Sequence, residues 1–242
     1  SLVLYTAYNH RFEPHFINMK YFLKKMEIGN IYRNNLRPAI NLDTVPIPDW
    51  DLFDPTSIYR PMQGKIYRAV GLETQRGCPY TCTFCEVGDR HWTKIIKQDY
   101  DKMIKEIDWV SKHKIEYLHL IDNNFGMYKN HRIISDLLID KLETTGYPNA
   151  LNITWAKHKK PYLFDIAEDL WKVGLNKSVT IALQSMNYQT LKAVERANEN
   201  TNLKEVVAYL KKRGMPAYIE TILGLPEETL DSFKEGLFRL ID

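Results

Sequence analysis

The chain has 242 residues, a length that suits one large domain or two small ones. Its composition, 44% hydrophobic and 26% charged, is ordinary for a globular protein and excludes a disordered or collagen-like chain. The 33 basic and 30 acidic side chains leave a net charge of +3, which is too small to indicate nucleic-acid binding by itself. No apolar run approaches the roughly 18 residues that a membrane span needs, and no signal peptide is visible. The first residue is not Met, so we expect a fragment of a longer protein.

The first 64 residues carry only weak patterns. Residues 15–25 have apolar side chains on one helical face, which predicts a short amphipathic helix. Residues 28–40 contain Gly, Pro and several Asn and predict turns or a hairpin. Four prolines between residues 45 and 64 favour extended backbone, so this stretch predicts a linker that lies on a domain.

From residue 65 onward, strand and helix patterns alternate. We predict strands at 66–72, 115–121, 151–156, 178–183 and 217–223. We predict helices at 93–112, 130–144, 161–173, 187–196, 203–213 and 228–240, with Asn187 as an N-cap and Gly174 as a C-terminal stop. Strands that alternate with helices indicate an α/β fold with a parallel sheet, and right-handed crossovers would curl it into a barrel or an open winding.

The first of these strands leads into a loop that holds all three cysteines of the chain, Cys78, Cys82 and Cys85. An odd number of cysteines within eight residues does not indicate a disulfide framework. Buried inert thiols are one explanation. A zinc site with His91 as fourth ligand is another, although structural zinc sites favour two separated pairs of ligands. We favour an iron–sulfur cluster, because thiolates are its standard ligands.

Three thiolates leave one iron of a 4Fe–4S cluster without a cysteine, and such an open position can bind a small molecule. The segment from Gly77 to Cys85, including Phe84 before the last cysteine, resembles the cluster loop of the radical S-adenosylmethionine (SAM) enzymes. The resemblance implies that the three thiolates hold the cluster and that the open iron binds the amino and carboxylate groups of SAM. It further implies that one electron cleaves SAM to methionine and a 5′-deoxyadenosyl radical, which takes a hydrogen atom from the substrate.

The resemblance covers about residues 65–242 and implies a partial (β/α)6 barrel of the TIM type. About five β/α units are readable, so we expect truncation before the sixth. In such folds, functional residues gather at the carboxyl ends of the strands. Asp122 to Gly126 follows the second strand, where a plain turn is an equally good interpretation. The family uses this loop for the amino group of SAM, which makes Asn123 and Asn124 candidates.

Gln184 and Ser185 end the fourth predicted strand, and Arg196 follows on the next helix. This segment resembles the family element that contacts the ribose or carboxylate of SAM. Ser185 could instead merely lead into the helix cap. Lys157 follows the third strand with His158, and could meet a substrate carboxylate or phosphate. We favour a solvated basic run for residues 157–160.

Glu220, Gly224 and Leu225 belong to a segment that resembles the fifth-strand element of the family, which lines the adenine site. The usual family form has Gly after Leu-Pro, whereas Glu227 stands at that position here. A positive φ at Glu227 would therefore be strained. The simpler interpretation of residues 226–229 is the opening of a helix with acidic residues near its N-terminus.

Residues 31–53 resemble the linker that joins a cobalamin-binding domain to a radical SAM core, an arrangement found in many methyltransferases and in enzymes that remodel carbon skeletons. Residues 1–44 are too few for a cobalamin domain. We therefore expect residues 1–44 to be the remnant of an upstream domain, 45–64 a linker and 65–242 the core. Cobalamin is then a further cofactor whose site lies mostly upstream.

The sequence thus indicates a radical SAM enzyme, with a methyltransferase as one possibility. An iron–sulfur electron-transfer protein and a zinc-binding interaction module are the alternatives. We expect a small-molecule or macromolecular substrate that the sequence does not identify, and a reductase, flavodoxin or ferredoxin as electron donor. We expect no membrane partner, and nucleic acid is not indicated. An exposed iron is oxygen-sensitive, so we expect a reducing cytoplasm.

Overall fold

The structure is a computed structural model. It describes residues 3–6, 41–44, 46, 59–62, 65–88, 93–157, 161–196 and 203–241. The helix expected at 15–25 and the hairpin expected at 28–40 lie outside these residues, as do most of the linker at 45–64, His91 and His158.

Nine strands and six α-helices occur in the described part of the chain. The strands are β1 (Val3–Thr6), β2 (Tyr59–Met62), β3 (Lys65–Leu72), β4 (Gln75–Arg76), β5 (Ile96–Lys97), β6 (Tyr117–Phe125), β7 (Ala150–Trp155), β8 (Val179–Gln184) and β9 (Ala217–Thr221). The helices are α2 (Tyr100–Lys112), α3 (His131–Thr145), α4 (Pro161–Lys172), α5 (Tyr188–Ala193), α6 (Leu203–Lys212) and α7 (Leu230–Ile241). Two short 3-10 helices, η2 (Leu42–Thr44) and η5 (Glu86–Gly88), complete them.

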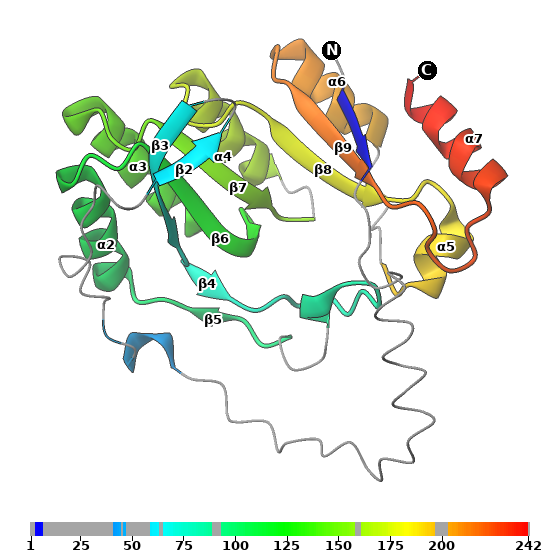
Figure 1. The fold of residues 1–242 in the computed structure, drawn as a ribbon, viewed down its shortest axis with the longest axis horizontal. Helices are drawn as coiled ribbons and strands as arrows, with labels where there is room; N and C mark the ends of the chain where they lie inside the picture. The colour runs from blue at the N-terminus through cyan, green and yellow to red at the C-terminus, as the bar shows by residue number, and fades with distance from the viewer. Residues whose placement is uncertain are drawn as a thin grey trace, which may run out of the picture.

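The strands of the predicted repeat are parallel wherever they pair. β3 pairs with β6 and β6 with β7, while β8 pairs with β9, all in parallel register. β7 and β8 are neighbours, but no hydrogen-bonded ladder joins them in the described part. The parallel strands therefore form two separate sheets, which meet at β7 and β8. Figure 1 shows α2, α3 and α4 packed beside β3, β6 and β7, with α6 beside β8 and β9. The predicted α/β fold, a partial barrel of about five β/α units, is confirmed.

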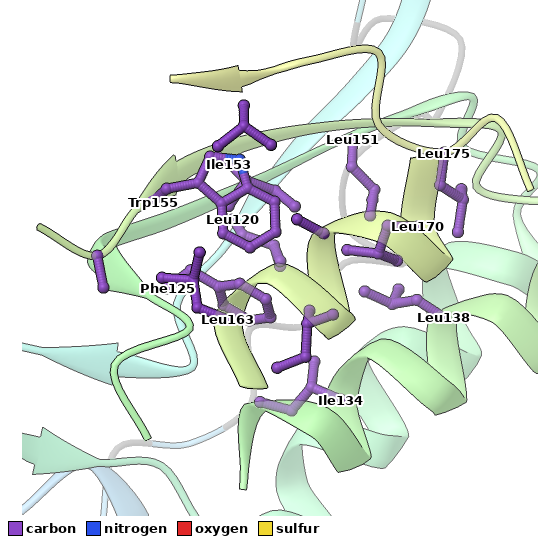
Figure 2. Packing of buried hydrophobic residues seen from close by; sticks show 14 of the residues in the cluster. Leu120, Phe125, Ile134, Leu138, Leu151, Ile153, Trp155, Leu163, Leu170 and Leu175 are labelled. Atoms are coloured by element: carbon purple, nitrogen blue, oxygen red, sulfur yellow. The ribbon is translucent and has the colours of Figure 1, made fainter. Parts of the chain in front are cut away.

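The core lies between the strands and the helices that cover them. Successive strand residues point to opposite faces, and β7 buries Leu151, Ile153 and Trp155 on its helix side. Figure 2 shows these side chains on the side of α4, which contributes Leu163 and Leu170, with Leu138 of α3 in the same cluster. The alternate face carries residues that are less buried, such as Asn152 on β7. The helices therefore cover one face of the strands, and the opposite face is left for a functional site.

Two predicted boundaries were wrong in ways that matter for the site. The helix expected at 93–112 begins only at residue 100, where the side chain of Asp99 accepts a hydrogen bond from the Lys102 N–H. Residues 96–97 instead form β5, which pairs with β4 next to the cysteine loop. The strand expected at 115–121 continues to Phe125, with a shift of register after Leu120. The polar residues 122–124 are thus part of the strand and not of a turn.

Other boundaries differ less. α5 ends at Ala193 and not at 196, and Glu195 has a positive φ of 51°. β9 ends at residue 221 and α7 begins at residue 230, so residues 222–229 form a longer connection than expected. β1 and β2 were not predicted; β1 adds a parallel strand beside β9, and β2 pairs antiparallel with β3. Both strands have four residues, too few for a clear alternation. None of the helices in the described ranges has the length and hydropathy that spanning a membrane requires.

Candidate metal and cofactor site

The three cysteines lie in a folded loop after β4. Cys78 is 2% and Cys82 is 1% exposed, whereas Cys85 is partly exposed, and all three thiols are free. The loop turns on itself through hydrogen bonds from the Cys85 N–H to the Cys82 carbonyl (3.0 Å) and from the Gly88 N–H to the Cys85 carbonyl (3.1 Å). Gly77 supplies a positive φ of 100° at its entrance, which Gly adopts without strain.

Gly88 packs directly on the cysteine loop. A Cβ at this position would lie 2.2 Å from the carbonyl oxygen of Cys82, which is closer than real Cβ atoms approach another heavy atom. The loop is also bonded to the C-terminal end of α5, because the Thr83 N–H donates to the carbonyl of Val194 at 3.0 Å. The positions of the thiols are therefore set by backbone contacts over a long sequence separation.

Asp122 fastens the entrance of the loop to β6. Its carboxylate is 1% exposed and accepts the backbone N–H groups of Thr74 at 2.7 Å and of Gln75 at 3.2 Å, as well as the Thr74 hydroxyl. Burial raises the pKa of Asp122 to about 6 from its ordinary 3.8, and the Thr74 hydrogen bonds only partly offset it. A buried carboxylate with three donors is a structural anchor, a role that the turn interpretation of residues 122–126 missed.

Nitrogen donors from three places converge on two of the sulfur atoms. The Asn124 amide Nδ2 lies 3.2 Å from Cys78 Sγ, and Lys157 Nζ lies 3.9 Å from the same sulfur. Arg196 Nη1 lies 3.8 Å from Cys82 Sγ, and Nη2 donates to the carbonyl of Ala182 on β8. Thus β6, the residues after β7 and the residues after α5 supply donors to the loop. The first two lie at carboxyl ends of parallel strands, where functional residues are expected.

The connections that follow β8 and β9 meet through a side-chain hydrogen bond, next to the backbone bond from the Ile222 N–H to the Gln184 carbonyl at 2.7 Å. Ser185 Oγ donates to Glu228 Oε1 at 2.6 Å and accepts the Asn187 N–H at 2.9 Å. Gln184 has a positive φ of 72°, which turns the chain sharply there. Burial raises the pKa of Glu228, opposed by the Ser185 hydrogen bond. Burial also raises the pKa of Glu220 on β9, opposed by the charge of Arg196.

A small apolar cluster adjoins the cysteine loop. Val194, Ile222 and Leu225 are buried together, and Phe84 of the loop packs against them. Gly224 has a positive φ of 87°, and Glu227 has one of 62°. The positive φ at Glu227 is the backbone strain that the departure from the family form predicted.

The sequence-predicted candidates are thus partly assembled. Phe84 and Leu225 share the apolar cluster, Asn124 contacts the cysteine loop, and Ser185 contacts the connection after β9. Asn123 and Gln184 lie at strand ends. Sequence reasoning missed the contact of Lys157 with the loop, because it favoured a solvated basic run. It also missed Glu228 as a partner of Ser185; the signal was an acidic residue in the fifth-strand element.

Several buried polar atoms near these strand ends have no hydrogen-bond partner in the described part of the chain. They include Asn124 Oδ1, Thr221 Oγ1 and Glu228 Oε2, as well as Gln75 Oε1 and Trp155 Nε1. Buried polar atoms are usually paired, so orphans that gather at one end of a barrel suit a polar ligand. Two buried thiols and a third nearby suit an iron–sulfur cluster as the metal group. No three His, Cys, Asp or Glu side chains among the described residues are grouped closely enough for a single metal ion. A cluster needs no such convergence, because each thiolate binds its own iron.

A comparison with protein families matches residues 72–240 to "Radical SAM superfamily". The chain belongs to the radical SAM superfamily. Proteins of this superfamily use a 4Fe–4S cluster and SAM and need an external reductant, so those predicted cofactors are confirmed, and the zinc and electron-transfer alternatives are not favoured.

Two curated relatives are 31% identical over 171 residues. They are the "Cobalamin-dependent radical SAM methyltransferase TokK" of Streptomyces tokunonensis and the "2-(S-pantetheinyl)-carbapenam-3-carboxylate methyltransferase" of Streptantibioticus cattleyicolor. Each match covers 70% of this chain and 25% of the relative, so the chain spans about a quarter of their length. The radical SAM methyltransferase TsrM of Kitasatospora setae shares the fold, with a TM-score of 0.56 and 15% identity over 72% of this chain and 34% of TsrM.

Proposed function

We propose that the protein to which this chain belongs is a cobalamin-dependent radical SAM methyltransferase. The observation that carries the proposal is the 31% identity to TokK over 171 residues, because TokK is named as such an enzyme. When bound, the 4Fe–4S cluster supplies the electron that cleaves SAM to methionine and a 5′-deoxyadenosyl radical, which abstracts hydrogen from the substrate. Cobalamin enters the proposal through the name of this relative.

In this proposal Cys78, Cys82 and Cys85 hold the cluster. Two of the thiols are buried and the loop around them is tied to β6 and α5, which supports a site with restricted water access. Restricted access matters because water and oxygen would compete with a radical reaction. Cys85, the partly exposed ligand, is proposed to lie on the more open side.

The SAM contacts that we propose follow the chemistry of each strand end. Asn124 Oδ1 is a buried acceptor that suits an ammonium group, with Asn123 beside it. Gln184, Ser185 and the buried Oε2 of Glu228 are positioned for hydroxyl donors of a ribose. We propose that the adenine lies beside Phe84, Gly224 and Leu225, with Glu220 on the adjoining strand.

The test is anaerobic reconstitution with iron and sulfide, followed by a strong reductant and SAM. We expect about four iron and four sulfide per chain and the formation of 5′-deoxyadenosine. Cys82→Ala should lose iron and product while circular dichroism keeps the helix signal, because the change lies on a loop. Lys177→Met, at an exposed site before β8, should match the wild type. Reconstituted wild type that leaves SAM intact would refute the proposal.

Methyl transfer is tested separately on the full-length protein, by supplying cobalamin and following S-adenosylhomocysteine. We also propose a flavodoxin, ferredoxin or reductase as electron donor and a reducing cytoplasm as compartment.

The domain layout that we propose is an upstream remnant at 1–44, a linker at 45–64 and the radical SAM core at 65–242. The substrate remains outside this proposal, because substrate contacts come from loops that differ among proteins of one fold.

A further inference from the structure

Cys78 differs from the other two cysteines in the donors that surround it. Two nitrogen atoms face its sulfur, Asn124 Nδ2 at 3.2 Å and Lys157 Nζ at 3.9 Å. Cys82 faces Arg196 at 3.8 Å, and no hydrogen bond to the sulfur of Cys85 occurs within the described ranges. The loop therefore places an uneven electrostatic environment around the three thiols.

The side chain of Asn124 is fully buried on β6. The backbone carbonyl of the same residue accepts the Gln75 side-chain amide at 3.3 Å, which ties the strand to the entrance of the cysteine loop at this point. Because the amide is buried, water does not replace its hydrogen bond to the Cys78 sulfur.

Lys157 acts through its charge. Its ammonium group lies over the ring of Tyr80 at 5.2 Å from the centroid, within the cysteine loop, which holds the cation near Cys78. Lys157 is only half-buried, so salt screens its field in a way that it cannot screen a buried amide.

We propose that Asn124 and Lys157 raise the reduction potential of the cluster by stabilising negative charge on the Cys78 thiolate. Reduction adds one electron to the cluster, and that charge spreads onto the sulfur ligands. Donors and cations beside a ligating sulfur stabilise the reduced form more than the oxidised form. Both residues are positioning and tuning groups for the cluster, and the inference rests on the cluster assignment of the proposed function.

The test is a redox titration of the reconstituted protein without SAM, followed by electron paramagnetic resonance. Asn124→Leu keeps the side-chain volume and removes the donor. At one fixed solution potential it should lower the ratio of reduced to oxidised cluster roughly tenfold, which is about 59 mV for a one-electron couple. Lys157→Met should lower the ratio by less, and the effect should shrink as salt is raised. Lys157→Arg, which keeps the charge, and Lys177→Met, at a distant exposed site, should titrate like the wild type.

Iron and sulfide analysis of every variant separates the possible outcomes. If Lys157→Met and Asn124→Leu hold wild-type iron and titrate at the wild-type potential, the inference is overturned while the proposed function stands. If Asn124→Leu fails to hold iron, the Lys157 variants test the inference. A lower ratio of reduced to oxidised cluster in Lys157→Met than in Lys157→Arg would support it, and equal ratios would overturn it. Wild-type protein that takes up no iron would refute the cluster assignment and the inference together.

Discussion

The buried carboxylate of Asp122 accepts the backbone N–H of Thr74, 48 residues earlier, at 2.7 Å. This bond joins the carboxyl end of β6 to the entrance of the cysteine loop. It acts together with the contact between Asn124 of the same strand and the Cys78 sulfur. The residue is therefore expected to influence both stability and the geometry of the loop.

Asp122→Asn is predicted to remove a pH-dependent term from stability. The raised pKa of about 6 means that the folded state holds the proton more tightly than the unfolded state, where the ordinary value is 3.8. The contribution of Asp122 protonation to the free energy of unfolding is thus fully present below about pH 4 and is lost as pH rises through 6. The difference between the folded and unfolded pKa values corresponds to about 3 kcal/mol of that free energy.

Urea unfolding of both proteins in the same iron-free state, between pH 5 and 7.5, measures this effect. Relative to the wild type, the Asn variant should gain stability as pH rises toward 6 and the gain should level off above it. Parallel curves for the two proteins would show that Asp122 does not titrate in this range.

Gly88→Ala is predicted to disrupt the cysteine loop and leave the barrel folded. Its Cβ would meet the Cys82 carbonyl oxygen at 2.2 Å, and a backbone atom cannot move aside as a flexible side-chain end can. We expect iron content after reconstitution to fall severalfold, with the helix signal retained. Gly146→Ala is the matched control, because a Cβ there meets nothing within 4 Å and only the positive φ of 79° is strained. A variant at Gly88 with full iron content would contradict the close packing.

Much of this architecture was visible in local patterns. The alternating strands and helices, the Asn187 cap and the stop at Gly174, whose φ is 81°, depend on neighbouring residues, which sequence periodicity reports. The cysteine spacing likewise lies within one short segment. These features predicted the fold that the structure shows and the three cysteines that we propose as cluster ligands.

Contacts between distant segments were not visible. Lys157 lies 79 residues after Cys78, and its local sequence is a basic run that resembles a solvated surface. The partnership of Ser185 with Glu228 spans 43 residues. Periodicity says which side of a strand is buried, but it does not say which side chains meet where several strands end.

Ser185→Ala is predicted to destabilise the protein by about 1–3 kcal/mol, because it leaves the Asn187 N–H and the Glu228 carboxylate without this partner. Glu228→Leu removes the acceptor of this bond together with a half-buried charge, so it should cost less. If the two residues act as a pair, the double variant should cost less than the sum of the single variants, by about 1 kcal/mol.

Urea unfolding of this double-mutant cycle at pH 7.5 checks the pairing. Thr144→Ala is the control, since its hydroxyl bonds only the Asp140 carbonyl on an exposed helix face and should change stability by less than about 0.5 kcal/mol. Strictly additive single variants would exclude a direct bond between Ser185 and Glu228.

Glu227→Gly is predicted to stabilise the protein. Glu227 holds a φ of 62°, a left-handed conformation that costs a side chain roughly 1–2 kcal/mol. Gly removes that cost but adds about 0.5–1 kcal/mol of chain entropy in the unfolded state. The net gain in the free energy of unfolding is about 0.5–1 kcal/mol, or about 2 °C in Tm.

Glu143→Gly in α3 is the control and should lower the free energy of unfolding by about 0.5–1 kcal/mol, because Gly is unfavourable in a helix. Opposite signs for the two Glu→Gly variants in thermal melts would establish the strain, whereas equal losses would show that residue 227 is not held at positive φ.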